Sequence, residues 1–177
     1  MIRQSEQEGA GRYEIRFSGS GGQGLITAAI IFAEAVGVYN GKHVCQTQSY
    51  GPEARGGKSK AEVVVSDQPI DYPKALELDL LLAMNQASCD AYFYDLKPNG
   101  LLVVDSSIVE QHPTSRIITV PFTEIAREKI GRELVANMIA LGTIGQLSGL
   151  VSGEILEKAL MARIPPGTEE MNRQALY

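Results

Sequence analysis

A glycine-rich turn near the start of the chain joins an alternating segment to a long apolar one. Residues 13–17 (Tyr-Glu-Ile-Arg-Phe) alternate in polarity like a strand, and residues 25–36 are almost wholly apolar over the length of a helix. Between them, Gly19, Gly21 and Gly24 match the pattern GxGxxG. The order predicts a strand, a glycine loop and a buried helix in succession.

The same alternation of strand and helix continues along the chain. Apolar or alternating runs predict further strands at residues 43–47, 60–65, 79–83, 101–104 and 117–120. Helical patterns occupy residues 86–96, 122–130, 134–147 and 152–162, and a turn at residues 98–100 (Pro-Asn-Gly) is expected to stop the first of these. We therefore expect an α/β, doubly wound fold with a mostly parallel, possibly mixed sheet, helices on both faces and a helical C-terminal part.

The chain is long enough for one domain. Its 177 residues are 44% hydrophobic, which suffices for a core without disulfide bonds. We expect a flexible segment at residues 1–12, which has no apolar stretch typical of a signal peptide, and a single domain at residues 13–177. Residues 134–153 carry no charge, but glycines and polar residues dilute their hydrophobicity, so we predict a cytoplasmic protein without a membrane span.

Charge and metal-ligand content exclude several functions. The net charge of -5, with acids and bases interspersed, argues against a nucleic-acid partner, which would need clustered Lys and Arg. Cys45 and Cys89 are the only cysteines, too few for an iron–sulfur ladder or a zinc knuckle. His43 and His112 are the only histidines and fit no ligand pattern. We predict no metal site.

A second segment, residues 46–57 (Gln-Thr-Gln-Ser-Tyr-Gly-Pro-Glu-Ala-Arg-Gly-Gly), is rich in turn residues and hydrogen-bonding groups. It follows a predicted strand, as the first glycine segment does, so the two are expected to converge at one edge of the sheet. The alternative is an ordered turn whose polar groups satisfy one another, in which Arg55 pairs with Glu53. The candidate binding residues are Gly19, Gly21, Gly22, Gln23, Gly24, Gln48, Ser49, Tyr50, Gly51, Glu53, Arg55 and Gly56.

Neither segment predicts a complete site on its own. A dinucleotide site expects an acidic residue about twenty positions after the glycines, but the second strand ends in Cys45, Gln46 and Thr47, so NAD is disfavoured. A helix N-terminus contributes on the order of 1 kcal/mol to anion binding, whereas micromolar affinity requires about 8 kcal/mol. Arg55 and Tyr50 could add a charged contact and a stacking face, which favours a site shared by both segments or with a partner chain.

No catalytic constellation is recognisable. The serines lack His-Asp partners, and neither GxSxG nor a Walker A lysine pattern occurs. Gly142, Gly145 and Gly149 lie in a charge-free helical segment and permit close backbone approach, either in the core or at a subunit interface. We infer that the chain assists chemistry that is carried out elsewhere.

The ordered motifs resemble the gamma subunits of 2-oxoacid:ferredoxin oxidoreductases. The resemblance rests on Gly-Ser-Gly-Gly-Gln-Gly at residues 19–24, the segment Gln48–Gly57, Asp105-Ser106, and Asn-Met-Ile-Ala-Leu-Gly at residues 137–142, and it covers residues 13–176. Within the family the sequence is most similar to the 2-oxoglutarate (KorC-type) subunit. Relatives that act on pyruvate, branched-chain oxoacids and indolepyruvate share the same core motifs.

The resemblance implies a subunit of a thiamine-diphosphate-dependent complex. Such a complex converts 2-oxoglutarate, CoA and oxidised ferredoxin to succinyl-CoA, CO2 and reduced ferredoxin. The implied partners are alpha and beta subunits, a ferredoxin-like subunit and ferredoxin, and the complex uses thiamine diphosphate, Mg2+, an iron–sulfur cluster and CoA. The chain lacks a GDG motif and cluster cysteines, in line with these cofactors belonging to the partners. The two glycine segments would then face those subunits and the CoA path.

Two alternatives of other classes remain. A stand-alone nucleotide-binding protein would bind NAD or ATP by itself. A purely structural assembly subunit would be needed for complex formation but not for turnover. Binding measurements on the isolated chain, and kinetics beside assembly assays, separate these from the main hypothesis.

Overall fold

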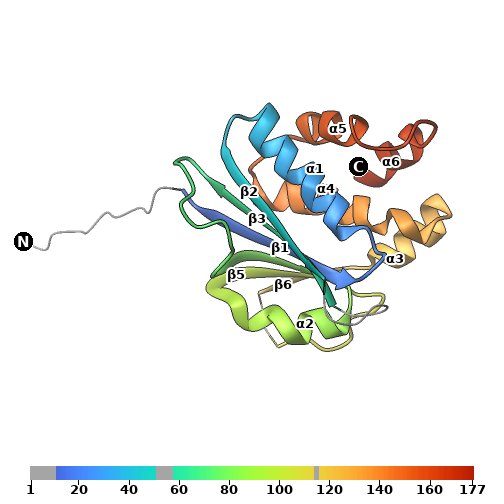
Figure 1. Cartoon of the computed structure of the whole chain (residues 1–177). Coiled ribbons are helices and arrows are strands. Elements are labelled where there is room, and N and C mark those ends of the chain that lie inside the picture. Colours follow the sequence, from blue (N-terminus) through green and yellow to red (C-terminus); the bar gives the residue numbers. More distant parts are fainter. Residues whose placement is uncertain (1–10, 51–57, 114–115) are drawn as a thin grey trace, which may run out of the picture.

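The protein forms a six-stranded sheet with helices on both faces (Figure 1). The structure is a computed structural model that describes residues 11–50, 58–113 and 116–177. The strands lie in the order β2-β3-β1-β4-β5-β6. Their bounds are β1 Tyr13–Ser20, β2 His43–Tyr50, β3 Lys58–Ser66, β4 Leu78–Ala83, β5 Leu96–Asp105 and β6 Ile117–Val120.

One strand runs against the others. β1, β4, β5 and β6 are mutually parallel, whereas β3 is antiparallel to both of its neighbours, β1 and β2. β2 therefore runs in the same direction as β1 although β3 separates them. The expected α/β fold is confirmed, and the sheet is of the mixed kind.

The two faces of the sheet differ in chemistry because side chains alternate along each strand. In β1, Ile15 and Phe17 are fully buried in the main hydrophobic core, together with helical residues such as Phe32 and Leu141. Their neighbours Glu14 and Arg16 are also buried, on the opposite face. A smaller apolar cluster beneath β4 and β5 includes Cys89.

The helices divide unequally between these faces. α1 (Leu25–Glu34) continues as a π-helical stretch, η1 (Ala35–Tyr39), and packs with the C-terminal helices on the main core, while α2 (Gln86–Tyr92) lies on the opposite side (Figure 1). The remaining elements are η2 Phe93–Asp95, α3 Phe122–Ile125, η3 Ala126–Ile130, η4 Glu133–Val135, α4 Ala136–Ser148, α5 Gly153–Met161 and α6 Glu169–Leu176. Within the described residues, no helix has the length and apolar character needed to cross a membrane.

The predicted turn at residues 98–100 is wrong. These residues belong to β5, which begins at Leu96, and α2 ends at Tyr92. Leu78 pairs with Leu96 and Leu80 with Leu101, so β5 has four residues where β4 has one. Pro, Asn and Gly therefore form an irregularity within a strand. Gly100 is required there because a Cβ atom would lie 2.7 Å from the carbonyl oxygen of Leu78.

Candidate functional site

The C-terminal ends of β1 and β2 lie at the same edge of the sheet. Gly19 pairs with Ser59 on one side of β3, and Tyr50 pairs with Ser59 on the other. β1 ends at Ser20 and β2 ends at Tyr50, on either side of the start of β3. The two strand ends therefore lie together, while the convergence of the whole segments stays a prediction, because residues 51–57 lie outside the described residues.

The glycine turn delivers the chain directly into α1. Gly22 and Gly24 have φ angles of 91° and 71°, values that side-chain-bearing residues rarely adopt. Gly24 is the N-cap of α1, where no side chain makes a capping hydrogen bond and no acidic residue occupies the first turn. The first-turn N–H groups, and the positive end of the helix dipole, therefore face this edge without a counter-charge from the helix itself.

Three side chains, one of them from the turn itself, hold the turn in place. Gln23 accepts a hydrogen bond from the N–H of Ser20 at 2.7 Å and donates to the carbonyl of Met84 at 3.4 Å. Asn85, which caps α2, donates to the Ser20 hydroxyl at 2.7 Å. Asn137 of α4, 8% exposed, donates to the Gly24 carbonyl at 3.1 Å. The turn is a braced structure that joins β1, β4, α2 and α4.

The second segment is described only at its beginning. Gln48 and Ser49 are exposed at the end of β2, and the backbone of Tyr50 continues the pairing with β3. The other candidates in this segment, Gly51, Glu53, Arg55 and Gly56, lie outside the described residues. The binding role of both segments stays a prediction.

A buried charge cluster behind this edge was not predicted from the sequence. Arg16 of β1 and Glu62 of β3, 3% and 5% exposed, form an ion pair of 2.7 Å. Arg16 also pairs with Asp95, and its guanidinium lies 4.9 Å from the centre of the Tyr92 ring. Lys60 reaches Glu62 at 3.0 Å. The available signal was a charged residue within each of two predicted strands, Arg16 in residues 13–17 and Glu62 in residues 60–65.

The charges of this cluster set the ionisation of Glu62. Burial by itself would raise the pKa of this carboxyl group, but the hydrogen bond from Lys60 and the nearby charges of Arg16 and Lys60 outweigh burial and lower the pKa below its ordinary value. Glu62 is therefore held as a carboxylate. In the adjacent α2, burial and the nearby Asp90 raise the pKa of the Cys89 thiol, which makes this cysteine a poor nucleophile.

Asp105 at the end of β5 has a structural role. Its carboxylate is fully buried and accepts hydrogen bonds from the N–H of Ser107 and from the N–H and hydroxyl of Thr123. These contacts tie the end of β5 to the start of α3. The Asp-Ser motif of the sequence thus fixes a turn, and its carboxylate is already occupied.

The helical glycines serve internal packing. A Cβ atom at Gly142 would clash with the carbonyl oxygen of Leu176 in α6, and one at Gly145 would lie 2.6 Å from Leu156 of α5. Of the two alternatives, core packing is therefore supported for these positions. Gly149 has a different role, since it ends α4 with a φ angle of 65°.

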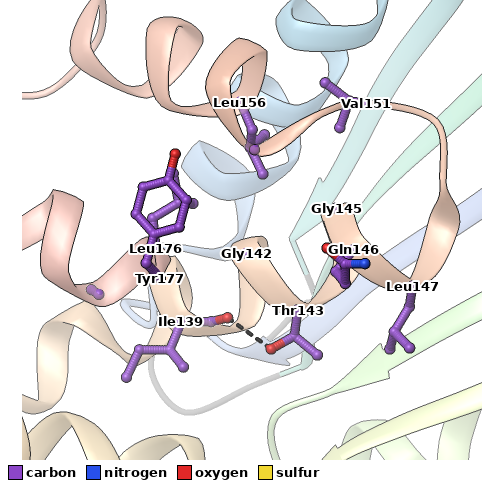
Figure 2. A pocket seen from close by; sticks show the side chains of 12 residues that line it. Ile139, Gly142, Thr143, Gly145, Gln146, Leu147, Val151, Leu156, Leu176 and Tyr177 are labelled. Carbon is purple, nitrogen blue, oxygen red and sulfur yellow. Dashed lines mark hydrogen bonds between the residues drawn. The ribbon is translucent and has the colours of Figure 1, made fainter.

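A pocket of about 380 Å³ lies between α4, α5 and the C-terminus (Figure 2). Most of its wall is aliphatic side chain and glycine backbone, with Ile139 and Leu156 among the lining residues. Its hydroxyl groups already have partners: Thr143 donates to the Ile139 carbonyl at 3.0 Å, and Tyr177 donates to Glu157 at 2.9 Å. The pocket has the chemistry of an apolar packing defect beside the core.

An iron–sulfur cluster does not fit this chain. Its two cysteines lie on different elements, Cys45 on β2 and Cys89 buried on α2. In the part of the chain that the structure describes, no three His, Cys, Asp or Glu side chains are grouped as metal ligands.

Comparisons with known proteins identify the family. The family model for pyruvate ferredoxin/flavodoxin oxidoreductase matches residues 14–177. The 2-oxoglutarate synthase subunit KorC of Methanocaldococcus jannaschii is 46% identical over 91% of this chain and 88% of its own. The pyruvate synthase subunit PorC of Methanothermobacter marburgensis is 32% identical over 92% of both.

A solved structure agrees with these matches. The gamma subunit of a keto/oxoacid ferredoxin oxidoreductase from Geobacter sulfurreducens superposes with a TM-score of 0.85 at 50% identity, covering 94% of this chain and 93% of that one. Fold and sequence therefore lead to one assignment. The chain belongs to the pyruvate ferredoxin/flavodoxin oxidoreductase family, and the resemblance to gamma subunits is confirmed.

Proposed function

We propose that the chain is the gamma subunit of a 2-oxoglutarate synthase, which converts 2-oxoglutarate, CoA and oxidised ferredoxin to succinyl-CoA, CO2 and reduced ferredoxin. The observation that carries this substrate choice is the difference in similarity: 46% identity to a KorC subunit against 32% to a PorC subunit, over nearly the same share of the chain. The subunit acts within a complex and has no turnover alone.

The proposal assigns the redox and decarboxylation chemistry to partners. Alpha and beta subunits and a ferredoxin-like subunit would carry thiamine diphosphate, Mg2+ and the iron–sulfur cluster, and ferredoxin would accept the electrons. The support from this chain is chemical: it has two cysteines, whereas a cluster typically needs four. The proposal includes a cytoplasmic location, which cell fractionation with an antibody to the chain tests.

For the edge formed by the two glycine segments, we propose a face toward CoA or the thiamine-bearing subunits. Free N–H groups at the start of α1 favour an anionic group, and CoA carries phosphates. The exposed Gln48 and Ser49 add side-chain donors on the far side of β3. Arg55, which lies in the second segment, would add a fixed positive charge.

Co-expression with the subunits encoded beside it tests the assignment. We expect the chain to co-purify with a thiamine-diphosphate subunit and a ferredoxin-like subunit, and the complex to show its highest kcat/KM with 2-oxoglutarate. Pyruvate, a branched-chain oxoacid and indolepyruvate are the comparison substrates. A higher kcat/KM with any of these would overturn the substrate choice while leaving the family assignment in place.

The role of the edge is tested within that complex. Arg55→Ala should raise the KM for CoA about tenfold with little change in assembly, because it removes one charge-assisted contact. Arg132→Ala, which removes an exposed arginine before η4, is the matched control. An unchanged KM would show that Arg55 does not contact CoA, and loss of assembly with normal turnover of the residual complex would favour the purely structural subunit.

Calorimetry of the isolated chain addresses the stand-alone nucleotide-binding alternative. That alternative predicts saturable binding of NAD or ATP by the chain alone. We expect none at millimolar ligand, because β2 ends in Gln48, Ser49 and Tyr50 and offers no carboxylate that could hold a ribose.

A further inference from the structure

A second, polar pocket lies on the opposite side of the sheet from the main core, over β2 and β3. Its volume is about 280 Å³. The register puts Thr47 beside Glu62 and Ser49 beside Lys60, with all four side chains on one face. The lining residues, which define what we call the β2–β3 pocket, are Thr47, Gln48, Ser49, Lys60, Glu62 and Lys74.

The one carboxylate in the β2–β3 pocket is already saturated. Oε1 of Glu62 accepts hydrogen bonds from Arg16 and Lys60, and Oε2 accepts one from the N–H of Ala75 at 3.3 Å. The last of these bonds attaches the segment that carries Lys74 to the sheet. Glu62 therefore builds the wall of the pocket and has little capacity left to satisfy its other groups.

Among the remaining polar groups of the described lining, donors outnumber acceptors, because two of these groups are ammonium groups that can only donate. Lys60 uses one of its three N–H bonds on Glu62. Among the described residues, the Lys74 amine and the hydroxyl groups of Thr47 and Ser49 have no hydrogen-bond partner. The described lining thus combines two ammonium groups, two hydroxyl groups and the Gln48 amide with one neutralised carboxylate, a surplus of donors that a ligand rich in acceptors would satisfy.

The charged groups of the pocket also favour an anionic ligand. Lys60 and Lys74 together exceed the single charge of Glu62, and Arg16 lies buried directly behind that carboxylate. Part of the Arg16 charge is balanced from the other side by Asp95. The field within the pocket is therefore positive, and its walls are partly desolvated, which strengthens the attraction of an anion.

We propose that the β2–β3 pocket binds a small oxyanion, namely a carboxylate or phosphate group. The inference stands on the donor surplus of the described residues and does not require the assignment of the glycine edge. Because the contacts are few and partly exposed, the expected dissociation constant is about 1 mM. Such a group is either a free metabolite or the anionic end of a larger ligand.

Titration of the full-length chain tests the proposal. Inorganic phosphate and succinate are the two probes, added at constant ionic strength with chloride as the balancing anion and followed by amide chemical shifts and calorimetry. We expect saturable shifts at residues 47, 49, 60 and 74. Saturation by phosphate alone identifies a phosphoryl ligand, and saturation by succinate alone identifies a carboxylate ligand.

Variants place the binding in this pocket. Lys74→Met, which removes an exposed ammonium group, should weaken binding about threefold, and combining it with Thr47→Val should weaken it about tenfold. Lys129→Met, which removes an exposed lysine of η3, is the control and should leave affinity unchanged. Absence of saturable binding up to about 20 mM in the parent chain, or equal affinity in all variants, would overturn the proposal.

Discussion

At the scale of single residues, Gly142 shows how one missing methyl group fixes a helix contact. Gly142→Ala would drive its Cβ atom into the carbonyl oxygen of Leu176, and backbone atoms cannot rotate away as a side chain can. We expect the free energy of unfolding to fall by roughly 1–3 kcal/mol, as overpacked core positions do. Urea denaturation followed by circular dichroism measures the change.

Gly21 supplies the control for this substitution. It is exposed, its φ angle is not positive, and among the described residues no atom beyond its chain neighbours lies within 4 Å of the position that a Cβ atom would take. Gly21→Ala should therefore change the free energy of unfolding by less than about 0.5 kcal/mol. Equal effects at both glycines would show that α6 does not pack against α4 as closely as described.

Glu62 gives a second prediction at this scale. Glu62→Gln leaves the buried Arg16 without its buried counter-charge and should cost roughly 3 kcal/mol of stability at pH 7. Because the folded-state pKa of Glu62 is lowered, the stability that its charge contributes is present above its unfolded-state pKa of about 4.3 and is lost as the pH falls through the lowered folded-state value.

The difference in free energy of unfolding between the parent and Glu62→Gln should therefore narrow as the pH falls below about 4.3. Urea midpoints at pH 7, 5 and 3.5 measure it. Glu77→Gln, at an exposed carboxylate before β4, is the matched control and should stay close to the parent throughout. If the difference in urea midpoint between the parent and Glu62→Gln stayed constant across this range, the negative charge of Glu62 would not be the source of the stability that its contacts with Arg16 and Lys60 provide.

At the scale of elements, Asn137 connects α4 to the glycine turn. Asn137→Ala removes the hydrogen bond to the Gly24 carbonyl and should cost about 1 kcal/mol. The effect should be local: amide hydrogen exchange should accelerate at residues 20–27 more than elsewhere. Thr143→Ala, which removes a hydroxyl bonded to its own helix, is the control. Uniform acceleration over the chain would contradict a specific brace.

Some helices and strands can be predicted from the sequence because local features specify them, whereas others depend on contacts with distant segments. β1 and α1 are predictable because alternation, glycine and a continuous apolar run are local features. The irregularity of β5 is not, since the pairing of Leu101 with Leu80 decides that Pro98 and Gly100 lie in a strand. α6 was not predicted for a similar reason, because its buried face packs against residues of another helix, α4.

The candidate site likewise has features that the sequence predicts and features that it does not. The ends of β1 and β2 lie at one edge because the two strands run in the same direction, which the βα pattern suggested, but the position of β3 between them was not predicted. The ion pair of Arg16 with Glu62 depends on register between strands, and the brace of Asn85 and Asn137 depends on how α2 and α4 pack beside β1, neither of which a single sequence specifies. The roles of these residues can be recognised only once the strands are paired and the helices are packed beside them.

At the scale of the whole molecule, the main core extends from the sheet through α1 to the C-terminal helices. Ala175 and Leu176 of α6 are buried members of this cluster. We therefore predict that the chain unfolds as one cooperative domain, with coincident urea transitions by tyrosine fluorescence and circular dichroism. Separate transitions would instead indicate two domains.

Truncation after Thr168 extends this prediction. Removing residues 169–177 uncovers Gly142 and deletes the ion pair between Arg173 and Glu157, so the urea midpoint should fall markedly while the transition stays single. Glu169→Ala, at an exposed first-turn position of α6, tests whether the loss comes from packing or from charge and should have a small effect. An unchanged midpoint in the truncated chain would remove α6 from the cooperative unit.

The antiparallel placement of β3 also sets a length scale. Neighbouring strands in a sheet lie about 4.8 Å apart, so the ends of β1 and β2, which lie on either side of β3, are about 10 Å from each other. A single phosphate spans only a fraction of that gap. Any one molecule that touches the ends of both strands must therefore be elongated, because a compact anion cannot reach from one strand end to the other across β3.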